Sequence, residues 1–148
     1  MAQRANDELD TEIFYHQIDV RTGVDHLNSI VEEIVQKHGR IDGLIAAAGI
    51  QQETPALEYT AADADRMLGV NVTGVLMTAQ AVARQMVRLN TPGSLVLIAS
   101  MSGTIANRGL ICPYVTRSPS LILPFHFPSS RLSNIRKNEK QKYATSPE

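Results

Sequence analysis

Residues 44–50 read LIAAAGI and residues 94–100 read SLVLIAS, and these two short apolar stretches are the clearest indication of the fold class. Neither stretch alternates apolar with polar residues, which is typical of strands buried on both faces in a parallel sheet. Between them, residues 60–89 have the apolar spacing of a long helix, and Pro92-Gly93 predicts a turn after it. The order strand, helix, strand predicts a right-handed crossover between two parallel strands.

A second strand and helix are predicted before this unit. Residues 13–20 (IFYHQIDV) form a β-branched and aromatic run that favours a strand. Apolar residues then recur at helical spacing from Val24 to Val35, and Gly39 is a natural end for that helix. The whole pattern therefore predicts the α/β class.

The long helix has a marked start and a marked interruption. Thr60 and Asp63 resemble a capping box, with Asp in place of the usual Glu. Gly69, Asn71 and Gly74 interrupt its middle, although a glycine inside a helix costs about 1 kcal/mol relative to alanine. Some gain elsewhere is therefore expected. The residues available for burial are Met67, Leu68, Leu76, Ala79, Val82, Ala83 and Met86.

Composition excludes several classes of protein. Hydrophobic residues make up 43% of the 148 residues and charged residues 20%, a globular profile. The net charge of −1 gives no reason to expect nucleic acid or an anionic membrane as partner. The single Cys112 excludes an internal disulfide framework, and the four histidines have no metal-ligand spacing. We expect a cytoplasmic protein with no signal peptide, membrane span or metal site.

The predicted elements carry an ordered set of motifs. In chain order, these are Asp19-Val20 after the first strand, Ala46-Ala47-Ala48-Gly49, Asn71 in GVNVTG, Ser100-Met-Ser102-Gly103 and Tyr114. Over about residues 14–113, the set resembles the short-chain dehydrogenase/reductase family, and its wording is most similar to the polyol dehydrogenase and ketose reductase branch. The resemblance implies a partial Rossmann-type, doubly wound parallel sheet that lacks the first βαβ unit and the C-terminal strands.

The resemblance also implies catalytic residues. Tyr114 would donate a proton to the carbonyl oxygen that receives a hydride, and Ser100 would hydrogen-bond that oxygen. Ser102 is the alternative to Ser100, because it lies nearer the usual spacing from the tyrosine. Asn71 would open the helix locally and hold a water molecule.

The expected cofactor is NADP or NAD. Asp19 and Val20 would lie against the adenine ring, and residues 46–49 (Ala46, Ala47, Ala48 and Gly49) occupy the place of the family's Asn-Asn-Ala-Gly. The alanines are also consistent with plain core packing, whereas Gly49 would let the backbone approach a cofactor closely.

Two departures from the family pattern predict impaired activity. Ser118 stands where the family has a lysine four residues after the tyrosine, Arg117 is one residue early, and Pro119 would break the helix. No glycine-rich phosphate turn is found before Ile13, and two strands that would neighbour residues 13–20 are missing. We therefore expect a partly open fold that binds a nicotinamide cofactor weakly.

The chain is expected to divide at residues 12 and 113. Residues 1–12 would be a flexible N-terminus, residues 13–113 a partial Rossmann-like domain, and residues 114–148 a disordered basic tail. That tail has no glycine, and Pro113-Tyr114-Val115 can be encoded with GTACGT, a splice-donor sequence. Translated intron is therefore a second interpretation of the tail.

An alternative function is a non-catalytic relative that binds a partner. In the resembled family, the helix at residues 60–89 helps to form a dimer interface. A homo- or hetero-oligomer through this helix is therefore expected, beside a small-molecule carbonyl or alcohol substrate.

Overall fold

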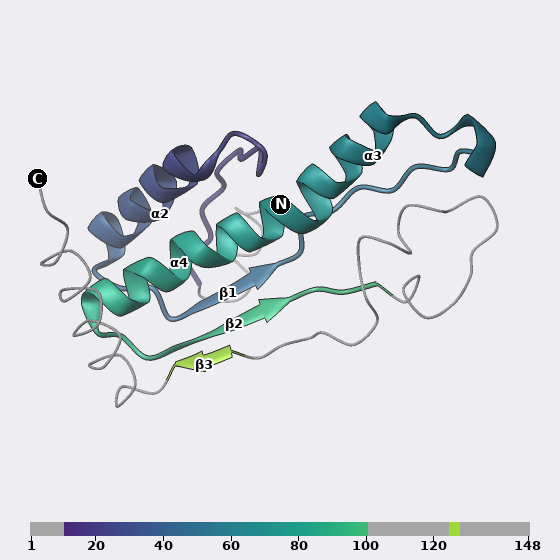
Figure 1. Ribbon diagram of the computed structural model, residues 1–148. Coiled ribbons are helices and arrows are strands. Elements are labelled where there is room, and N and C mark those ends of the chain that lie inside the picture. Colours follow the sequence, from purple (N-terminus) through teal and green to yellow (C-terminus); the bar gives the residue numbers. More distant parts are fainter. Residues whose placement is uncertain (1–10, 101–124, 128–148) are drawn as a thin grey trace, which may run out of the picture.

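The computed structural model describes residues 11–100 and 125–127, which form a layer of helices over one face of a small sheet (Figure 1). The elements in chain order are α2 (Val24–His38), β1 (Gly43–Ala46), the 3₁₀ turn η1 (Ala56–Glu58), α3 (Ala61–Leu68), the π-helical η2 (Gly69–Gly74), α4 (Val75–Leu89), β2 (Gly93–Leu97) and β3 (Phe125–Phe127). None of the helices within residues 11–100 is long and apolar enough to cross a bilayer.

The sheet confirms the α/β class. β1 and β2 are parallel, with Gly43 opposite Ser94 and Ala46 opposite Leu97. β3 pairs with the other edge of β2 in the antiparallel direction, with Leu95 opposite Phe125. This third strand lies within residues 114–148, where the sequence predicted a disordered tail; the remainder of that tail lies outside the described residues, so the prediction stays untested there.

Burial of the strands differs from the prediction. Leu95 on β2 is 3% exposed, but Ile45 on β1 is 70% exposed. The reason is that α2 and α4 both lie on one side of the sheet (Figure 1). The described part of the sheet is therefore buried on one face only, and the expectation of strands buried on both faces is wrong for β1.

The predicted strand at residues 13–20 is also absent. Residues 11–19 have no regular secondary structure and pair with none of the described strands. Ile13, Phe14 and Ile18 are each at least 40% exposed. β-Propensity reflects how well a side chain fits a neighbouring pleated surface. A run of β-branched and aromatic residues that has no strand to pair with therefore does not form a strand. Phe14 instead lies beside α2, with the Lys37 ammonium 3.5 Å from its ring centroid.

Helix α2 matches the sequence prediction closely. Leu27, Val31 and Val35 are buried, as the helical spacing predicted. Gly39 ends the helix in the left-handed conformation (φ 78°), and its N–H donates to the carbonyl of Val35 at 2.7 Å. This conformation favours glycine because it has no Cβ.

The long helix forms as one interrupted rod of α3, η2 and α4 (Figure 1). Thr60 caps its start by accepting a hydrogen bond from the backbone N–H of Asp63 at 3.1 Å. Of the residues available for burial, Met67, Ala79, Val82 and Met86 are buried, and Ala83 packs partly on the core. Leu68 and Leu76 are 36% and 57% exposed, so they face away from the core.

The core lies between α2, α4 and β2. Its buried members are Leu27, Val31, Ala79, Ala81, Val82, Met86 and Leu95. One polar side chain, Gln85, is buried among them and donates a hydrogen bond to Glu32 on α2 at 3.3 Å. Gly93 allows close packing here, because a Cβ at that position would lie 2.5 Å from Cε of Met86.

Candidate functional site

The carboxyl ends of β1 and β2 open at the same edge of the sheet. The two strands are parallel and in register to their last residues, and the N–H of Ile98 donates to the carbonyl of Ala46 at 3.1 Å. Ala47–Gly49 and Ser100 therefore leave the sheet at one edge. In open parallel sheets, ligands bind outside this edge.

Asn71 connects this edge to the long helix. It is 5% exposed and lies in the π-helical segment η2. Its Oδ1 accepts from the N–H of Ile50 at 2.8 Å, and its Nδ2 donates to the carbonyl of Ile50 at 3.0 Å. Nδ2 also lies 3.1 Å from the sulfur of Met67. The side chain thus satisfies both backbone groups of one loop residue, as a neighbouring strand would.

The turn at residues 19–22 packs against the same π-helical segment. The N–H and hydroxyl of Thr22 both donate to the carbonyl of Asp19, at 3.2 Å and 2.8 Å. A Cβ on Gly74 would lie 2.5 Å from Cγ2 of Val20. Glycine at position 74 therefore lets Val20 approach the helix backbone, which is one gain that offsets its low helix propensity.

The turn, the loop after β1 and the long helix line an open cleft of about 350 Å³. This volume lies within the range of small-molecule sites. The cleft is lined by Ile18, Asp19, Val20, Arg21, Ala48, Gly49, Ile50, Arg66 and Val70. Most of the lining side chains are apolar, and the charged groups come from the turn and from α3. A flat, mostly apolar ring with polar edges suits such a lining.

The charge on Asp19 is fixed by its neighbour Arg21. The carboxylate accepts from the backbone N–H of Arg21 at 2.9 Å and from its Nε and Nη2 at 3.3 Å and 3.0 Å. These hydrogen bonds lower the pKa of Asp19 below its ordinary value and raise the pKa of Arg21. Asp19 is therefore a carboxylate at neutral pH, which can only accept hydrogen bonds.

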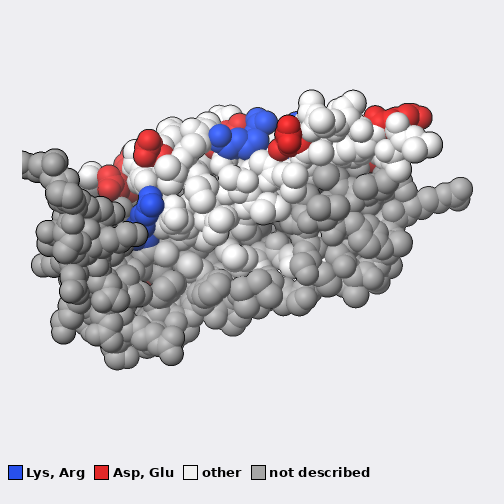
Figure 2. Space-filling model, in the orientation of Figure 1, with Lys and Arg blue, Asp and Glu red and all other residues white. Residues whose placement is uncertain are grey.

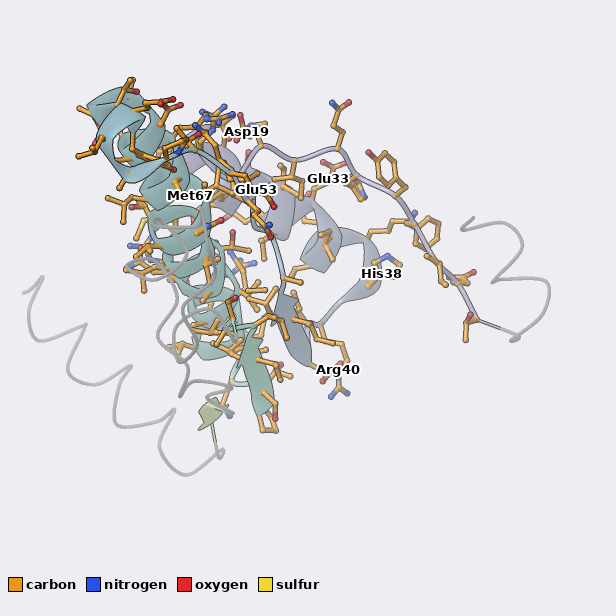
Figure 3. The ribbon with its side chains drawn as sticks, turned by 90° about the vertical axis from the view of Figure 1, so that its right-hand side faces the viewer. Asp19, Glu33, His38, Arg40, Glu53 and Met67 are labelled. Carbon is orange, nitrogen blue, oxygen red and sulfur yellow. The ribbon has the colours of Figure 1, made fainter. Side chains whose placement is uncertain are left out.

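The figures place this pair within the molecule. Figure 3 shows Asp19 at the same end of the fold as Met67 and Glu53, while Arg40 lies at the opposite end. Figure 2 shows acidic and basic side chains adjoining one another along the upper margin of the visible face. Arg40 and Asp42 form a second pair of the same i, i+2 type, remote from the cleft, with Nε of Arg40 2.9 Å from Oδ1 of Asp42.

The structure brings together four of the six predicted cofactor residues. Asp19, Val20, Ala48 and Gly49 all line the cleft. Ala46 instead ends β1 and is 5% exposed, and Ala47 is exposed outside the cleft lining. The interpretation of the alanines as core-packing residues therefore holds for Ala46.

The predicted catalytic residues are only partly placed. Asn71 contacts Ile50 of the cleft wall, and Ser100 is half-buried beyond the end of β2. Tyr114 and the alternative Ser102 lie outside the described residues. Their catalytic roles stay predictions. Within residues 11–100 and 125–127, no group of His, Cys, Asp and Glu side chains could hold a metal ion.

Sequence reasoning missed two cleft residues from the long helix. Arg66 and Val70 precede Asn71 and are one helical turn apart, so they face the same side. The available signal was the four-residue spacing of Arg66 and Val70, which places both on one face of the helix. It could not be used without knowing that the Asp19 turn lies opposite this helix face.

Comparison with known proteins agrees with this geometry. The short chain dehydrogenase family profile matches residues 1–116. A short-chain dehydrogenase/reductase of Aspergillus versicolor is 34% identical over 99 residues, covering 67% of this chain and 34% of that protein. D-arabinitol 2-dehydrogenase of Candida albicans is 43% identical over 75 residues, covering 50% of this chain and 27% of that protein.

A solved structure shares the fold. NAD⁺-bound xylitol dehydrogenase superposes with a TM-score of 0.68 at 28% identity, covering 78% of this chain and 45% of that chain. The chain spans about a third of the length of the curated relatives that it matches. The matched profile covers well over half of the present sequence. The chain belongs to the short-chain dehydrogenase family.

Proposed function

We propose that this chain provides the adenosine-binding part of an NAD- or NADP-dependent oxidoreductase that interconverts a carbonyl and an alcohol. The observation that carries the proposal is the cleft, which joins Asp19 and Val20 to Ala48 and Gly49 although the two pairs come from different segments. A bound nicotinamide cofactor would supply the hydride for reduction of the carbonyl and accept it in oxidation of the alcohol. The proposed substrate is a polyol or ketose, as the names of the similar arabinitol and xylitol dehydrogenases suggest.

The cleft residues fit the adenine end of such a cofactor. Val20, Ala48, Ile50 and Val70 offer apolar contact to the faces of a ring. The Asp19 carboxylate is an acceptor for an exocyclic amine, and its charge is held by Arg21. Gly49, which has no side chain, would let the ribose approach the loop backbone. The hydroxyl of Ser100, at the same sheet edge, would donate to a substrate oxygen, and Tyr114 would supply the proton.

Cofactor affinity is expected to be weak. Nothing in residues 11–100 forms a glycine-rich turn that opens a helix toward the cleft, which is the usual cradle for a pyrophosphate. The adenine end alone would then provide most of the binding energy. Micromolar binding of NADPH by the purified chain would contradict this expectation.

Titration of the full chain with NADH and NADPH, followed by calorimetry, tests cofactor binding. We expect weak, saturable binding that Asp19→Asn reduces further, because the amide loses one acceptor oxygen and its charge. Asp42→Asn is the matched control, since Asp42 pairs with Arg40 in the same way but lies remote from the cleft. No binding of either nucleotide, or equal loss in both variants, would overturn the adenosine site.

A separate assay tests the reaction. D-Arabinitol and xylitol oxidation with NAD⁺ or NADP⁺ should be slow or absent, because Ser118 and Arg117 do not reproduce the expected lysine after Tyr114. A kcat/KM of about 10⁴ M⁻¹s⁻¹ or more, within the ordinary range for enzymes, would show that the proposed impairment is wrong.

The proposed location is the cytoplasm, where a single free thiol such as Cys112 is usual.

A second function is favoured by the surface of the long helix. Leu68, Val72 and Leu76 recur every four residues and are 36%, 42% and 57% exposed. We propose that this apolar stripe, residues 68, 72 and 76, binds another subunit of the family, either a second copy of this chain or a longer relative. Such binding would need no turnover by the chain itself.

A further inference from the structure

The three charged side chains that line the cleft are not equivalent. Asp19 and Arg21 are bound to each other through both guanidinium nitrogens that face the carboxylate, and the backbone N–H of Arg21 adds a further hydrogen bond. This pair is neutral as a unit. The charge of Arg21 is therefore already paired, and Arg66 is the lining cation without a carboxylate partner among residues 11–100.

Arg66 is held at the cleft without being neutralised there. Its Nη2 donates to the side-chain oxygen of Gln52, and Nε2 of Gln52 donates in turn to Oγ1 of Thr54 at 3.1 Å. No carboxylate lies within ion-pair distance of Arg66 among residues 11–100. The charge of Arg66 also lowers the pKa of the Asp63 carboxyl, although it is the smallest of the causes that lower this pKa. The amide contact orients the guanidinium plane but leaves its charge in place.

The cleft wall opposite Arg66 carries apolar side chains, as contact with the second face of a stacked ring requires. Arg66 and Val70 come from the helix side of the cleft, whereas Ile18, Val20 and Ala48 come from the turn and the loop. An arginine plane stacks on an aromatic face, and nucleic-acid bases use the same contact. A lysine ammonium carries the same charge but has no plane to stack.

We propose that Arg66 is a further ligand-binding residue of the cleft, whose guanidinium plane covers one face of the purine ring. This inference rests on the proposed dinucleotide site and adds a residue to it. The contact is made to the base, so it acts equally on NAD and NADP and does not depend on the phosphates.

Calorimetric titration of the full chain with NADH, neutral adenosine and nicotinamide mononucleotide tests the proposal. Arg66→Gln should weaken adenosine binding about 3- to 10-fold, the range expected for loss of one cation–π contact. Arg66→Lys should weaken it as well, because an ammonium keeps the charge but has no plane to stack on the base. Both variants should weaken NADH binding by a similar factor and leave nicotinamide mononucleotide binding unchanged. Arg84→Gln, an exposed arginine on α4 outside the cleft lining, is the control for net charge.

Each contrary outcome has a distinct meaning. Full affinity for adenosine in Arg66→Lys, with loss only in Arg66→Gln, would show that charge alone matters and would overturn stacking. Unchanged adenosine binding in both variants, while the unmodified chain still binds NADH, would overturn the role of Arg66 and leave the proposed function standing. Failure of the unmodified chain to bind NADH or adenosine would overturn the site itself. Far-UV circular dichroism checks that the variants fold alike.

Discussion

At the residue scale, Asn71 holds the wall of the cleft in place. Its amide satisfies both the N–H and the C=O of Ile50, at 2.8 Å and 3.0 Å, from a position that is 5% exposed. The sequence indicated an important asparagine within an opened helix, and the structure confirms the opening as the π-helical η2. The partner of the side chain could not be predicted, because Ile50 belongs to a loop whose course depends on β1.

Asn71→Ala should lower the free energy of unfolding by roughly 1–3 kcal/mol, because it leaves two backbone groups of Ile50 without a partner in a half-buried place. Urea denaturation measures the change. Thr73→Ala, an exposed neighbour in the same π-helical segment, should change stability by less than about 0.5 kcal/mol. Equal effects of the two substitutions would contradict the proposed tie to Ile50.

The pair of Asp19 and Arg21 gives a prediction about pH. The Arg21 hydrogen bonds lower the pKa of Asp19 in the folded chain. Any stability from the pair is therefore present above the ordinary carboxyl pKa and is lost as pH falls through the lowered one. Arg21→Gln should return the pKa of Asp19 toward its ordinary value of 3.8, measured by ¹³C NMR titration of the carboxyl. An unchanged pKa in that variant would show that the pair does not persist in solution.

At the element scale, the helices were predictable and the first strand was not. The helical spacing of α2, the glycine at its end and the threonine at the start of α3 are local signals, and the structure uses each of them. A strand depends on its neighbours, so the β-rich run at residues 13–20 could not reveal whether it is paired. Strand β3 was not predicted for the same reason, because the strand it pairs with, β2, is distant in sequence.

The packing of the Asp19 turn on η2 is a second element-scale property. Gly74→Ala should destabilise the chain by about 1–3 kcal/mol, because the new Cβ would lie 2.5 Å from Cγ2 of Val20 and 3.1 Å from the Gly69 carbonyl. Thermal unfolding measures the loss. Gly43→Ala is the matched control, since its Cβ would meet nothing closer than 3.5 Å.

The same substitution connects packing to the cleft. If the Val20 contact is the cause, Val20→Ala should recover part of the loss in the double variant, and a double-mutant cycle reports the coupling. Additive effects would show that the strain lies in the helix backbone instead. Because Val20 lines the cleft, Gly74→Ala should also weaken NADH binding.

At the scale of the whole molecule, the described sheet has helices on one face only, and Ile45 on β1 is 70% exposed. The sequence predicted the α/β class and the family from ordered local motifs. It overestimated burial of β1 because an apolar run indicates what a strand can tolerate, and not which layers cover it. The same limit applies to Leu68 and Leu76, whose apolar character does not distinguish the core from a subunit interface.

Exposed apolar residues on the long helix predict association. Leu68, Val72 and Leu76 form the apolar stripe, whereas Gln80 and Arg84 continue the same exposed side as polar residues. Exposed apolar residues that adjoin one another mark a protein contact surface more often than apolar residues scattered singly over the surface. Sedimentation velocity should therefore show the mass of the particle rising with protein concentration. Leu76→Lys should abolish that rise, because a charge at the most exposed position of the stripe would lose its water on association.

Leu57→Lys distinguishes association through the apolar stripe from nonspecific association of exposed apolar residues. Leu57 is 100% exposed and lies on η1, outside the stripe, so its replacement should leave association unchanged. Both positions are exposed enough that neither variant should shift the unfolding midpoint appreciably. Equal loss of association in the two variants would indicate nonspecific aggregation. A chain that stays monomeric at all accessible concentrations would exclude self-association, and the stripe would then be tested with a longer relative by co-sedimentation.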